Sequence, residues 1–234
     1  MMQNAMGVIG GMGSMASEVF YRMVIARTPA ACDQEHINMI LLNHADMPDR
    51  TAAIKAGDAS EMAQKVQRLL KEDALFLQQA GCRAFVVTCN TAHYFVHRFE
   101  KELQIPCISM IRAAAEELSE RFPGGRIAVL GTDGTLSTGL YQDALAQRGL
   151  HGEGLDAAGQ AAVMGLIYDC VKAGKPADPA LLKLVEDRAL GGGYDAALLA
   201  CTELSVLKED GVFSDFFVDA MDVLARRFVE FSQA

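Results

Sequence analysis

Short apolar segments alternate with longer amphipathic segments along most of this chain. The apolar segments span residues 8–9, 37–42, 85–89, 106–110, 127–131 and 197–201. Each is short and mostly apolar, which is typical of a buried strand. Strands that alternate with helices favour a parallel sheet with helices on its faces. The pattern therefore predicts an α/β fold.

Residues that cap helices place the helices between these strands. Ser60 is expected to cap a long amphipathic helix, and Gly81 is expected to end it. The apolar face of that helix is predicted to consist of Met62, Val66, Leu69, Leu70 and Leu77. Ser14 is the expected cap of a helix that follows the first strand, and another helix is expected from about Ala92. Residues 43–59 are expected to form a polar loop, and residues 220–231 a final helix.

The order of elements repeats in the second half of the chain. A glycine loop follows the first strand at residues 10–13, a similar loop follows residues 127–131, and each half later reaches a strand that carries a cysteine. We therefore predict two pseudo-symmetric domains, residues 1–112 and 113–217, each with a small parallel sheet flanked by helices. The helix in residues 218–234 is expected to pack back on the first domain. Two such domains would leave a cleft between them, where we expect the active site.

The composition excludes several classes of function. The 234 residues carry a net charge of -9 and no basic stripe, which argues against a nucleic-acid partner. No apolar stretch approaches bilayer length, so no membrane partner is expected. The first residues lack the basic residues of a signal peptide, and the six cysteines lack Cys-x-x-Cys spacing. We therefore expect a cytoplasmic protein with reduced thiols.

Two of the cysteines occupy matching positions at the ends of apolar strands. The two segments read Phe85-Val86-Val87-Thr88-Cys89-Asn90-Thr91 and Ala197-Leu198-Leu199-Ala200-Cys201-Thr202-Glu203. Residues at the carboxyl ends of parallel strands usually line the ligand crevice of an open α/β sheet. One thiol in each half therefore suggests two acid/base groups that face one substrate. The other cysteines lack polar motifs and are expected to be structural; they are Cys32, Cys82, Cys107 and Cys170.

Two patterns that resemble cofactor or metal sites are incomplete. Residues 11–16 fit the dinucleotide pattern G-x-G-x-x-A, but the second strand ends at Asn43-His44 where that fold needs an acidic residue. A helical series of potential metal ligands consists of Cys89, His93 and His97. The cysteine of that series is expected to end a strand, and no further ligand completes the set. We therefore expect no cofactor and no metal.

Six motifs occur in an order that resembles one known family. They are Gly10-Gly11-Met12-Gly13, Asp33-Gln34-Glu35-His36, Pro48-Asp49-Arg50-Thr51, Cys89-Asn90-Thr91-Ala92-His93, Val171-Lys172-Ala173-Gly174 and Cys201-Thr202-Glu203. Together they resemble the cofactor-independent aspartate/glutamate racemases over residues 7–221. The resemblance implies an isomerase that works without pyridoxal phosphate. It also implies two pseudo-symmetric α/β domains, one catalytic cysteine from each domain, and a homodimer.

The resemblance assigns roles to residues in both halves. It implies that Cys89 and Cys201 act on opposite faces of the α-carbon of a dicarboxylic amino acid, one as thiolate base and the other as thiol acid. A single base would return the proton to the face from which it came. A helix N-terminus is expected after each cysteine and would favour the thiolate. The residues implied in substrate binding are Met12, Asp49, Arg50, Thr51, Asn90, Thr91, Ala92, Lys172, Thr202 and Glu203.

Several of these roles have alternatives. Arg50 can hold a carboxylate in a two-point fork. Asp49 either contacts the ligand or orients Arg50. Thr202 and Glu203 either orient Cys201, bind the substrate ammonium group or cap a helix.

The predicted substrate follows from the two cationic side chains. Arg50 and Lys172 favour a dianionic substrate, so we predict interconversion of L- and D-aspartate or glutamate. The sequence does not separate these two amino acids, because they differ by one methylene group. A maleate isomerase or hydantoin racemase of the same superfamily would also use paired cysteines. The alternative of another class is a protein that only binds acidic amino acids, and binding alone would need neither thiol.

Overall fold

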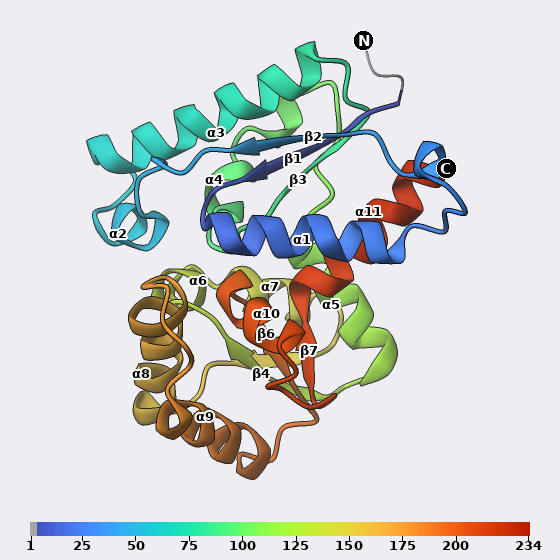
Figure 1. Cartoon of the computed structure of the whole chain (residues 1–234). Coiled ribbons are helices and arrows are strands. Elements are labelled where there is room, and N and C mark those ends of the chain that lie inside the picture. Colours follow the sequence, from blue (N-terminus) through green and yellow to red (C-terminus); the bar gives the residue numbers. More distant parts are fainter. Residues whose placement is uncertain (1–3) are drawn as a thin grey trace. The chain divides into compact units, whose positions relative to one another are not determined.

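A computed structural model describes residues 4–234 of the chain (Figure 1). These residues form two compact units. The first unit contains the chain up to Met110 together with Met221–Ala234, and the second contains Ile111–Ala220. Each unit has its own parallel sheet with flanking helices. This confirms the α/β fold with two small parallel sheets that the alternating pattern predicts.

The sheet of the first unit has three parallel strands in the order β2-β1-β3. These strands are β1 (Met6–Gly10), β2 (Met39–Asn43) and β3 (Phe85–Val87). Val8 in the central strand lies opposite Leu41 on one side and Val86 on the other. All residues of β1 and β3 are buried, whereas β2 lies at the edge and is partly exposed. Burial on both faces explains why β1 and β3 are apolar throughout.

Helices cover both faces of this sheet. Figure 1 shows α3 (Glu61–Gln79) along one face and α1 (Ser14–Arg27) along the other. The side of α3 that packs on the sheet consists of Ala63, Val66, Leu70, Ala74 and Leu77. The buried side of α1 includes Val19, Phe20 and Met23. Both helices therefore present an apolar stripe to a sheet that is apolar on both faces.

Shorter helices and the carboxyl-terminal helix complete the first unit. They are α2 (Arg50–Lys55), α4 (His93–Val96) and 3-10 turns at Asp33–Glu35 and Glu100–Glu102. The helix α5 (Met110–Arg121) leads into the second unit. The helix α11 (Ala220–Gln233) packs on α1, where the ring centroids of Phe20 and Phe228 lie 5.6 Å apart. The end of the chain thus shares its core with the amino-terminal sheet.

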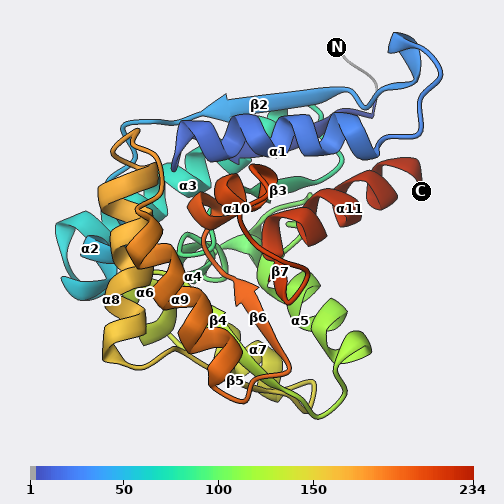
Figure 2. The same cartoon turned by 60° about the horizontal axis from the view of Figure 1, so that its bottom comes forward.

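The sheet of the second unit has four parallel strands in the order β5-β4-β6-β7. They are β4 (Arg126–Leu130), β5 (His151–Glu153), β6 (Ala196–Leu199) and β7 (Phe217–Asp219). The connecting helices are α6 (Asp133–Ser137), α7 (Leu140–Ala146), α8 (Ala157–Gly165), the π-helix η3 (Leu166–Val171), α9 (Pro179–Gly191) and α10 (Thr202–Glu209). Figure 2 shows α8 and α9 side by side in this unit.

Two of the capping predictions are confirmed, and two details are wrong. Ser60 Oγ accepts a hydrogen bond from Ala63 N at 3.1 Å, and Gly81 follows α3 with a φ of +84°. Ser14 does not cap α1. The N-cap residue of α1 is Gly13, and no side chain caps the start of this helix. Met62 is 41% exposed, since it lies on the outer side of α3.

Several short elements were not predicted or were placed wrongly. The loop over residues 43–59 contains α2, and the helix expected from Ala92 is only the four-residue α4. Residues 106–110 form a single bridge between Cys107 and Phe85 instead of a strand. Two short strands were not predicted: β5, and β7, which follows the strand that ends before Cys201. Strands of three residues are too short to show a period.

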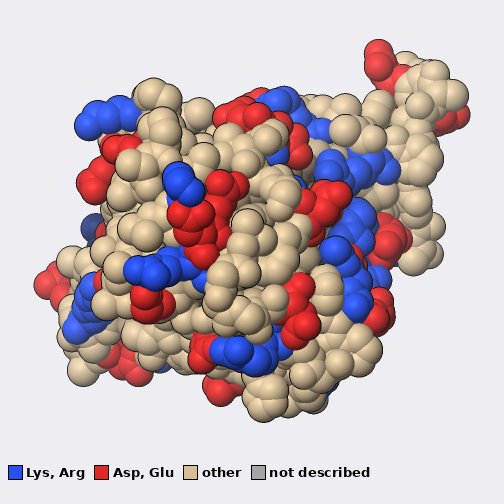
Figure 3. All heavy atoms as spheres, turned by 90° about the horizontal axis from the view of Figure 1, so that it is seen from below, with Lys and Arg blue, Asp and Glu red and all other residues tan. Residues whose placement is uncertain are grey.

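Charged side chains of both signs are interspersed on the face drawn in Figure 3. This face therefore carries no continuous basic surface. Exposed ion pairs also join Lys71 to Glu102 in the first unit and Arg126 to Glu153 in the second, each at 2.6 Å. Among the helices of residues 4–234, none is long and apolar enough to cross a membrane.

Candidate active site

The first cysteine of the matched pair lies two residues beyond the carboxyl end of β3. Cys89 is 6% exposed, and the residues that follow it before α4 are buried; they are Asn90, Thr91 and Ala92. Cys89 and Ala92 share one apolar cluster with Met12 and Met47. The first unit therefore brings Met12 of the glycine loop into the same core as Cys89.

His93 holds the main chain at Cys89. The backbone N–H of Met110 donates to His93 Nε2 at 3.3 Å, so the ring proton resides on Nδ1. Nδ1 donates to the backbone oxygen of Cys89 at 3.0 Å. The ring is fully buried and therefore fixes the loop between β3 and α4. Both ring nitrogens therefore have backbone partners, and neither is available to bind a metal together with the Cys89 thiol.

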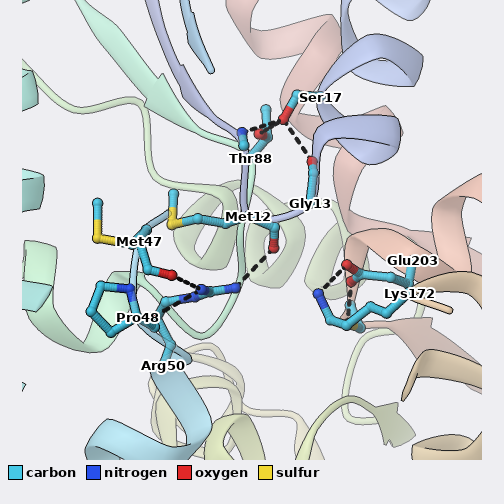
Figure 4. A network of polar contacts seen from close by, with 11 residues as sticks. Met12, Gly13, Ser17, Met47, Pro48, Arg50, Thr88, Lys172 and Glu203 are labelled. Atoms are coloured by element: carbon cyan, nitrogen blue, oxygen red, sulfur yellow. Dashed lines mark hydrogen bonds and ion pairs between the residues drawn. The ribbon is translucent and has the colours of Figure 1, made fainter. Parts of the chain in front are cut away.

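The glycine loop after β1 is held by a hydroxyl that the sequence did not single out. Ser17 Oγ in α1 accepts from Gly11 N at 2.9 Å and donates to the backbone oxygen of Gly13 at 2.9 Å (Figure 4). Thr88, next to Cys89, contacts the same oxygen through its own hydroxyl at 3.0 Å. Gly11 has a φ of +88°, and a Cβ there would lie 2.5 Å from the backbone nitrogen of His44. Ser17 therefore ties the glycine loop to the strand that delivers Cys89.

Arg50 is buried at the start of α2 and clamps two loops together. Its Nη1 donates to the backbone oxygens of Met47 at 3.2 Å and Pro48 at 3.0 Å, and its Nη2 donates to that of Met12 at 3.0 Å (Figure 4). Asp49 Oδ1 accepts from Ala52 N at 2.7 Å, so Asp49 caps α2. The planar guanidinium is thus held rigidly before any ligand binds. Thr51, the next residue of α2, is also buried.

The second cysteine is the N-cap residue of α10. Cys201 follows β6 after Ala200 and is 6% exposed. Its Sγ donates to Glu203 Oε2 at 3.0 Å, and Glu203 Oε1 forms an ion pair with Lys172 (Figure 4). Lys172 follows the π-helix, and its backbone N–H donates to Ile167 O at 2.9 Å. The second unit therefore brings together three of the predicted site residues, and Thr202 beside them is 1% exposed.

Burial controls the protonation of this second thiol. Burial raises the pKa of Cys201 well above its ordinary value of 9.0, the charge of Glu203 raises that pKa further, and Lys172 lowers it. The backbone N–H of Glu203 at the start of α10 lowers the pKa of Cys201, as expected of a helix N-terminus, but burial outweighs it. A helix terminus contributes about 0.3–1 kcal/mol at an exposed site, which is small beside the desolvation of a buried anion.

Two further polar residues near Cys201 were not predicted from the sequence. Burial raises the pKa of the Tyr141 hydroxyl well above its usual range, and the charges of Asp219 and Cys201 raise it further. Asp219 Oδ1 accepts a 2.6 Å hydrogen bond from Ser205. Tyr141 lies in α7 and Asp219 ends β7. The short apolar run before Asp219 was a sequence signal for β7, and recognising that strand would have placed Asp219 at its carboxyl end.

Metal-ligating side chains do not gather within residues 4–234. No group of three or more His, Cys, Asp or Glu side chains there could hold a metal ion. The series Cys89, His93 and His97 fails because Cys89 precedes α4 and does not lie on it.

Comparisons with known proteins place this arrangement in a family. The model of the Asp/Glu/Hydantoin racemase family matches residues 9–228. A glutamate racemase of Aquifex aeolicus is 29% identical over 163 residues, which is 68% of this chain and 61% of that protein. The broad specificity amino-acid racemase RacX of Bacillus subtilis is 24% identical over 147 residues, which is 61% of each protein. This chain thus spans less than two thirds of the length of these curated relatives.

Solved structures agree over a larger share of the chain. The aspartate racemase of Picrophilus torridus has a TM-score of 0.78 and 27% identity, covering 98% of this chain and 94% of that one. A structure described as a putative Asp/Glu racemase from Yersinia pestis has a TM-score of 0.80 at 22% identity, covering 99% and 100%, which shows the same fold. The sequence resemblance is confirmed. This chain belongs to the Asp/Glu/Hydantoin racemase family.

Proposed function

We propose that this chain is an amino-acid racemase that interconverts L- and D-aspartate, glutamate or both, without pyridoxal phosphate or a metal. One observation carries the proposal: a family member has a buried thiol beyond the carboxyl end of a parallel strand in each of its two units. Several relatives are glutamate racemases, and a structural relative is an aspartate racemase. In an open α/β sheet, that end of the strands is where ligands bind.

Two thiols suit the inversion of an α-carbon. The thiolate of one cysteine removes the α-proton, and the electron pair of the C–H bond remains on the substrate as a planar carbanion. The thiol of the other cysteine donates its proton to the opposite face, and its S–H electron pair remains on sulfur. One proton leaves and one arrives, so the thiols exchange states in each turnover. Cys89 and Cys201 take these two roles.

The remaining predicted residues supply binding groups. Arg50 is a rigid buried cation, and we propose that it binds a substrate carboxylate. Lys172 is proposed to bind the other acidic group or to balance charge in the intermediate. The buried polar segment after Cys89, together with Met12, Asp49, Thr51 and Thr202, is proposed to line the same site.

A broader range of amino-acid substrates is the second candidate function. The carboxylate of Glu203 pairs with Lys172 and cancels part of the positive charge that would attract a second acidic group. A relative of this chain is a broad specificity amino-acid racemase. A substrate panel therefore includes neutral amino acids, a hydantoin and maleate beside the acidic amino acids.

The assembly, the location and the domain limits form part of the same proposal. The family resemblance supports a homodimer in the cytoplasm, with domains over residues 1–112 and 113–217 and the final helix on the first domain. Sedimentation analysis of the purified chain at several concentrations would measure the assembly. A mass of one chain throughout would remove the dimer from the proposal.

Incubation with each enantiomer in heavy water tests the reaction. A two-base racemase places deuterium at the α-carbon mainly in the newly formed enantiomer during early turnover, which mass spectrometry after chiral separation measures. Binding of an acidic amino acid without exchange at the α-carbon would favour the non-catalytic binding protein. Isomerisation of maleate to its trans isomer, in place of exchange, would favour the maleate isomerase.

Matched cysteine variants test the two thiols. Cys89→Ala and Cys201→Ala should each abolish racemisation in both directions, because inversion needs an acid and a base. Cys82→Ala and Cys170→Ala serve as controls, because these cysteines are also buried, one in each unit, and should retain activity. An active Cys201→Ala variant would refute the assigned roles.

A further inference from the structure

The sulfur of Cys201 is linked to two charged groups in an environment with little water. Its Sγ donates to one oxygen of Glu203 at 3.0 Å, and the other oxygen of that carboxylate pairs with the ammonium group of Lys172. Cys201 is 6% exposed and Glu203 is 4% exposed. In such surroundings each charge acts strongly on the protonation of its neighbours.

Charge balance favours the thiol over the thiolate. With Cys201 protonated, the carboxylate of Glu203 and the ammonium of Lys172 cancel. Loss of the thiol proton adds an anion within hydrogen-bond distance of an existing carboxylate, and one cation then faces two anions. The Lys172 ammonium also lies 5.8 Å from the centroid of the Tyr168 ring, within the range of a cation–π interaction.

The other polar groups near Cys201 do not reverse this preference for the protonated thiol. Tyr141 in α7 is fully buried and acts on Cys201 as a neutral phenol. Asp219 at the end of β7 adds negative charge that acts on Tyr141, and it accepts a hydrogen bond from Ser205. Among the groups named in α7, β7, α10 and the turn after the π-helix, Lys172 supplies the positive charge.

We propose that Glu203 is a positioning residue that keeps the transferable proton on Cys201, with Lys172 as its counter-ion. Cys201 then holds its proton at rest. When substrate reacts, the S–H bond of Cys201 breaks as the new Cα–H bond forms, and the electron pair stays on sulfur. Lys172 then faces both the thiolate and the carboxylate until the proton returns.

The kinetic consequence rests on the proposed racemase activity. Because L and D forms are equally stable, kcat/KM must be equal in both directions at every pH, so no directional difference is expected. The active form carries one proton on the pair of thiols, and activity falls at high pH when that proton is lost. Glu203 therefore sets the alkaline limb of the pH profile in both directions alike.

The first experiment follows the thiols and does not need racemase activity. The intact chain is treated with iodoacetamide over a range of pH, and peptide mass spectrometry gives the alkylation rate of Cys201, with the exposed Cys32 as internal reference. In Glu203→Gln the alkylation of Cys201 should begin at lower pH, with a rate at least about tenfold above wild type at a pH below the wild-type midpoint. Glu209→Gln is the control, because it removes the same charge from the exposed end of α10.

A second variant keeps the test decisive if Glu203→Gln does not fold. Lys172→Met removes the counter-ion, so alkylation of Cys201 should then begin at higher pH than in the wild type. Opposite shifts in the two variants support the proposal. An unchanged midpoint in either folded variant, or a shift of the same size in Glu209→Gln, would overturn it.

The kinetic experiment separates this inference from the proposed function. In Glu203→Gln the alkaline limb of kcat/KM should move to lower pH by about one unit or more, equally for both enantiomers. A purely structural role would lower the height of the profile and leave the limb in place, which would also overturn the inference. If the chain shows no racemase activity, the proposed function fails, and the alkylation profile still decides whether Glu203 holds the proton on Cys201.

Discussion

Replacement of Ser17 by alanine should destabilise the first unit far more than replacement of Ser14 in the same helix. The two serines lie three residues apart, and only Ser17 uses its hydroxyl in the core. Ser17 is 1% exposed, and its oxygen uses its full capacity of one donated and two accepted hydrogen bonds. Ser14 is exposed at the helix start.

The size of the expected destabilisation follows from the backbone group that Ser17→Ala leaves without a partner. In Ser17→Ala the backbone oxygen of Gly13 still accepts from the backbone N–H of residue 17 at 3.2 Å, and the Thr88 hydroxyl still has the backbone oxygen of Ile9 within 3.5 Å. The N–H of Gly11 loses its hydroxyl partner, and a buried N–H without a partner costs about 1–3 kcal/mol. At about 2–4 °C per kcal/mol for a chain of this size, the melting temperature should fall by roughly 2–12 °C.

Calorimetry of the two variants measures this difference, and amide exchange locates it. The N–H of Gly11 should exchange faster in Ser17→Ala, while the amides of the second unit should keep their protection. Ser14→Ala should change the melting temperature by little, since exposed substitutions usually stay within about 0.5 kcal/mol. Equal melting temperatures for both variants would refute the role assigned to Ser17.

Three other substitutions probe the site and its support. Arg50→Lys keeps the charge and loses the planar fork, so kcat/KM should fall by about ten- to hundredfold in a racemisation assay, because a hydrogen bond to a charged group contributes about 1.5–3 kcal/mol. His93→Phe leaves the backbone oxygen of Cys89 and the N–H of Met110 without their His93 partner, so the free energy of unfolding should fall by about 2–6 kcal/mol in thermal melts. Burial raises the pKa of Asp73 above its ordinary value of 3.8, so the folded chain binds that proton more tightly than the unfolded chain does. Wild-type stability should therefore fall as the pH rises from 3.8 through the raised pKa, and Asp73→Asn should remove this slope in thermal melts.

Exposed residues of the same type provide the controls for these three variants. Arg22→Lys, His97→Phe and Asp215→Asn should leave activity, stability and pH slope near those of the wild type, since all three side chains lie at the surface. If Arg50→Lys retained full activity, the fork would not bind substrate. If His93→Phe had the same melting temperature as the His97→Phe control, His93 would not support the loop at Cys89. A slope that persists in Asp73→Asn would assign the pH dependence to another group.

The sequence by itself determined the features that depend on neighbours along the chain. The apolar runs that end before Cys89 and Cys201 indicated strands because burial on both faces needs continuous apolar residues. Ser60 and Gly81 bounded α3 because capping is made within one helical turn. The ordered motifs around both cysteines indicated the family for the same reason, since each motif is a local series of residues.

Only the tertiary structure decided the partners that lie far apart in the chain. Ser17 meets Thr88 across 71 positions, and Lys172 meets Glu203 across 31 positions, distances over which no local period or spacing carries a signal. The raised pKa of Cys201 likewise comes from desolvation by the surrounding unit, which outweighs the helix N-terminus that the sequence indicated. Tertiary packing determines the protonation of the Cys201 thiol, because the solvation of a charge depends on all the groups around it. Strand and helix patterns, in contrast, depend on residues that are close in the sequence.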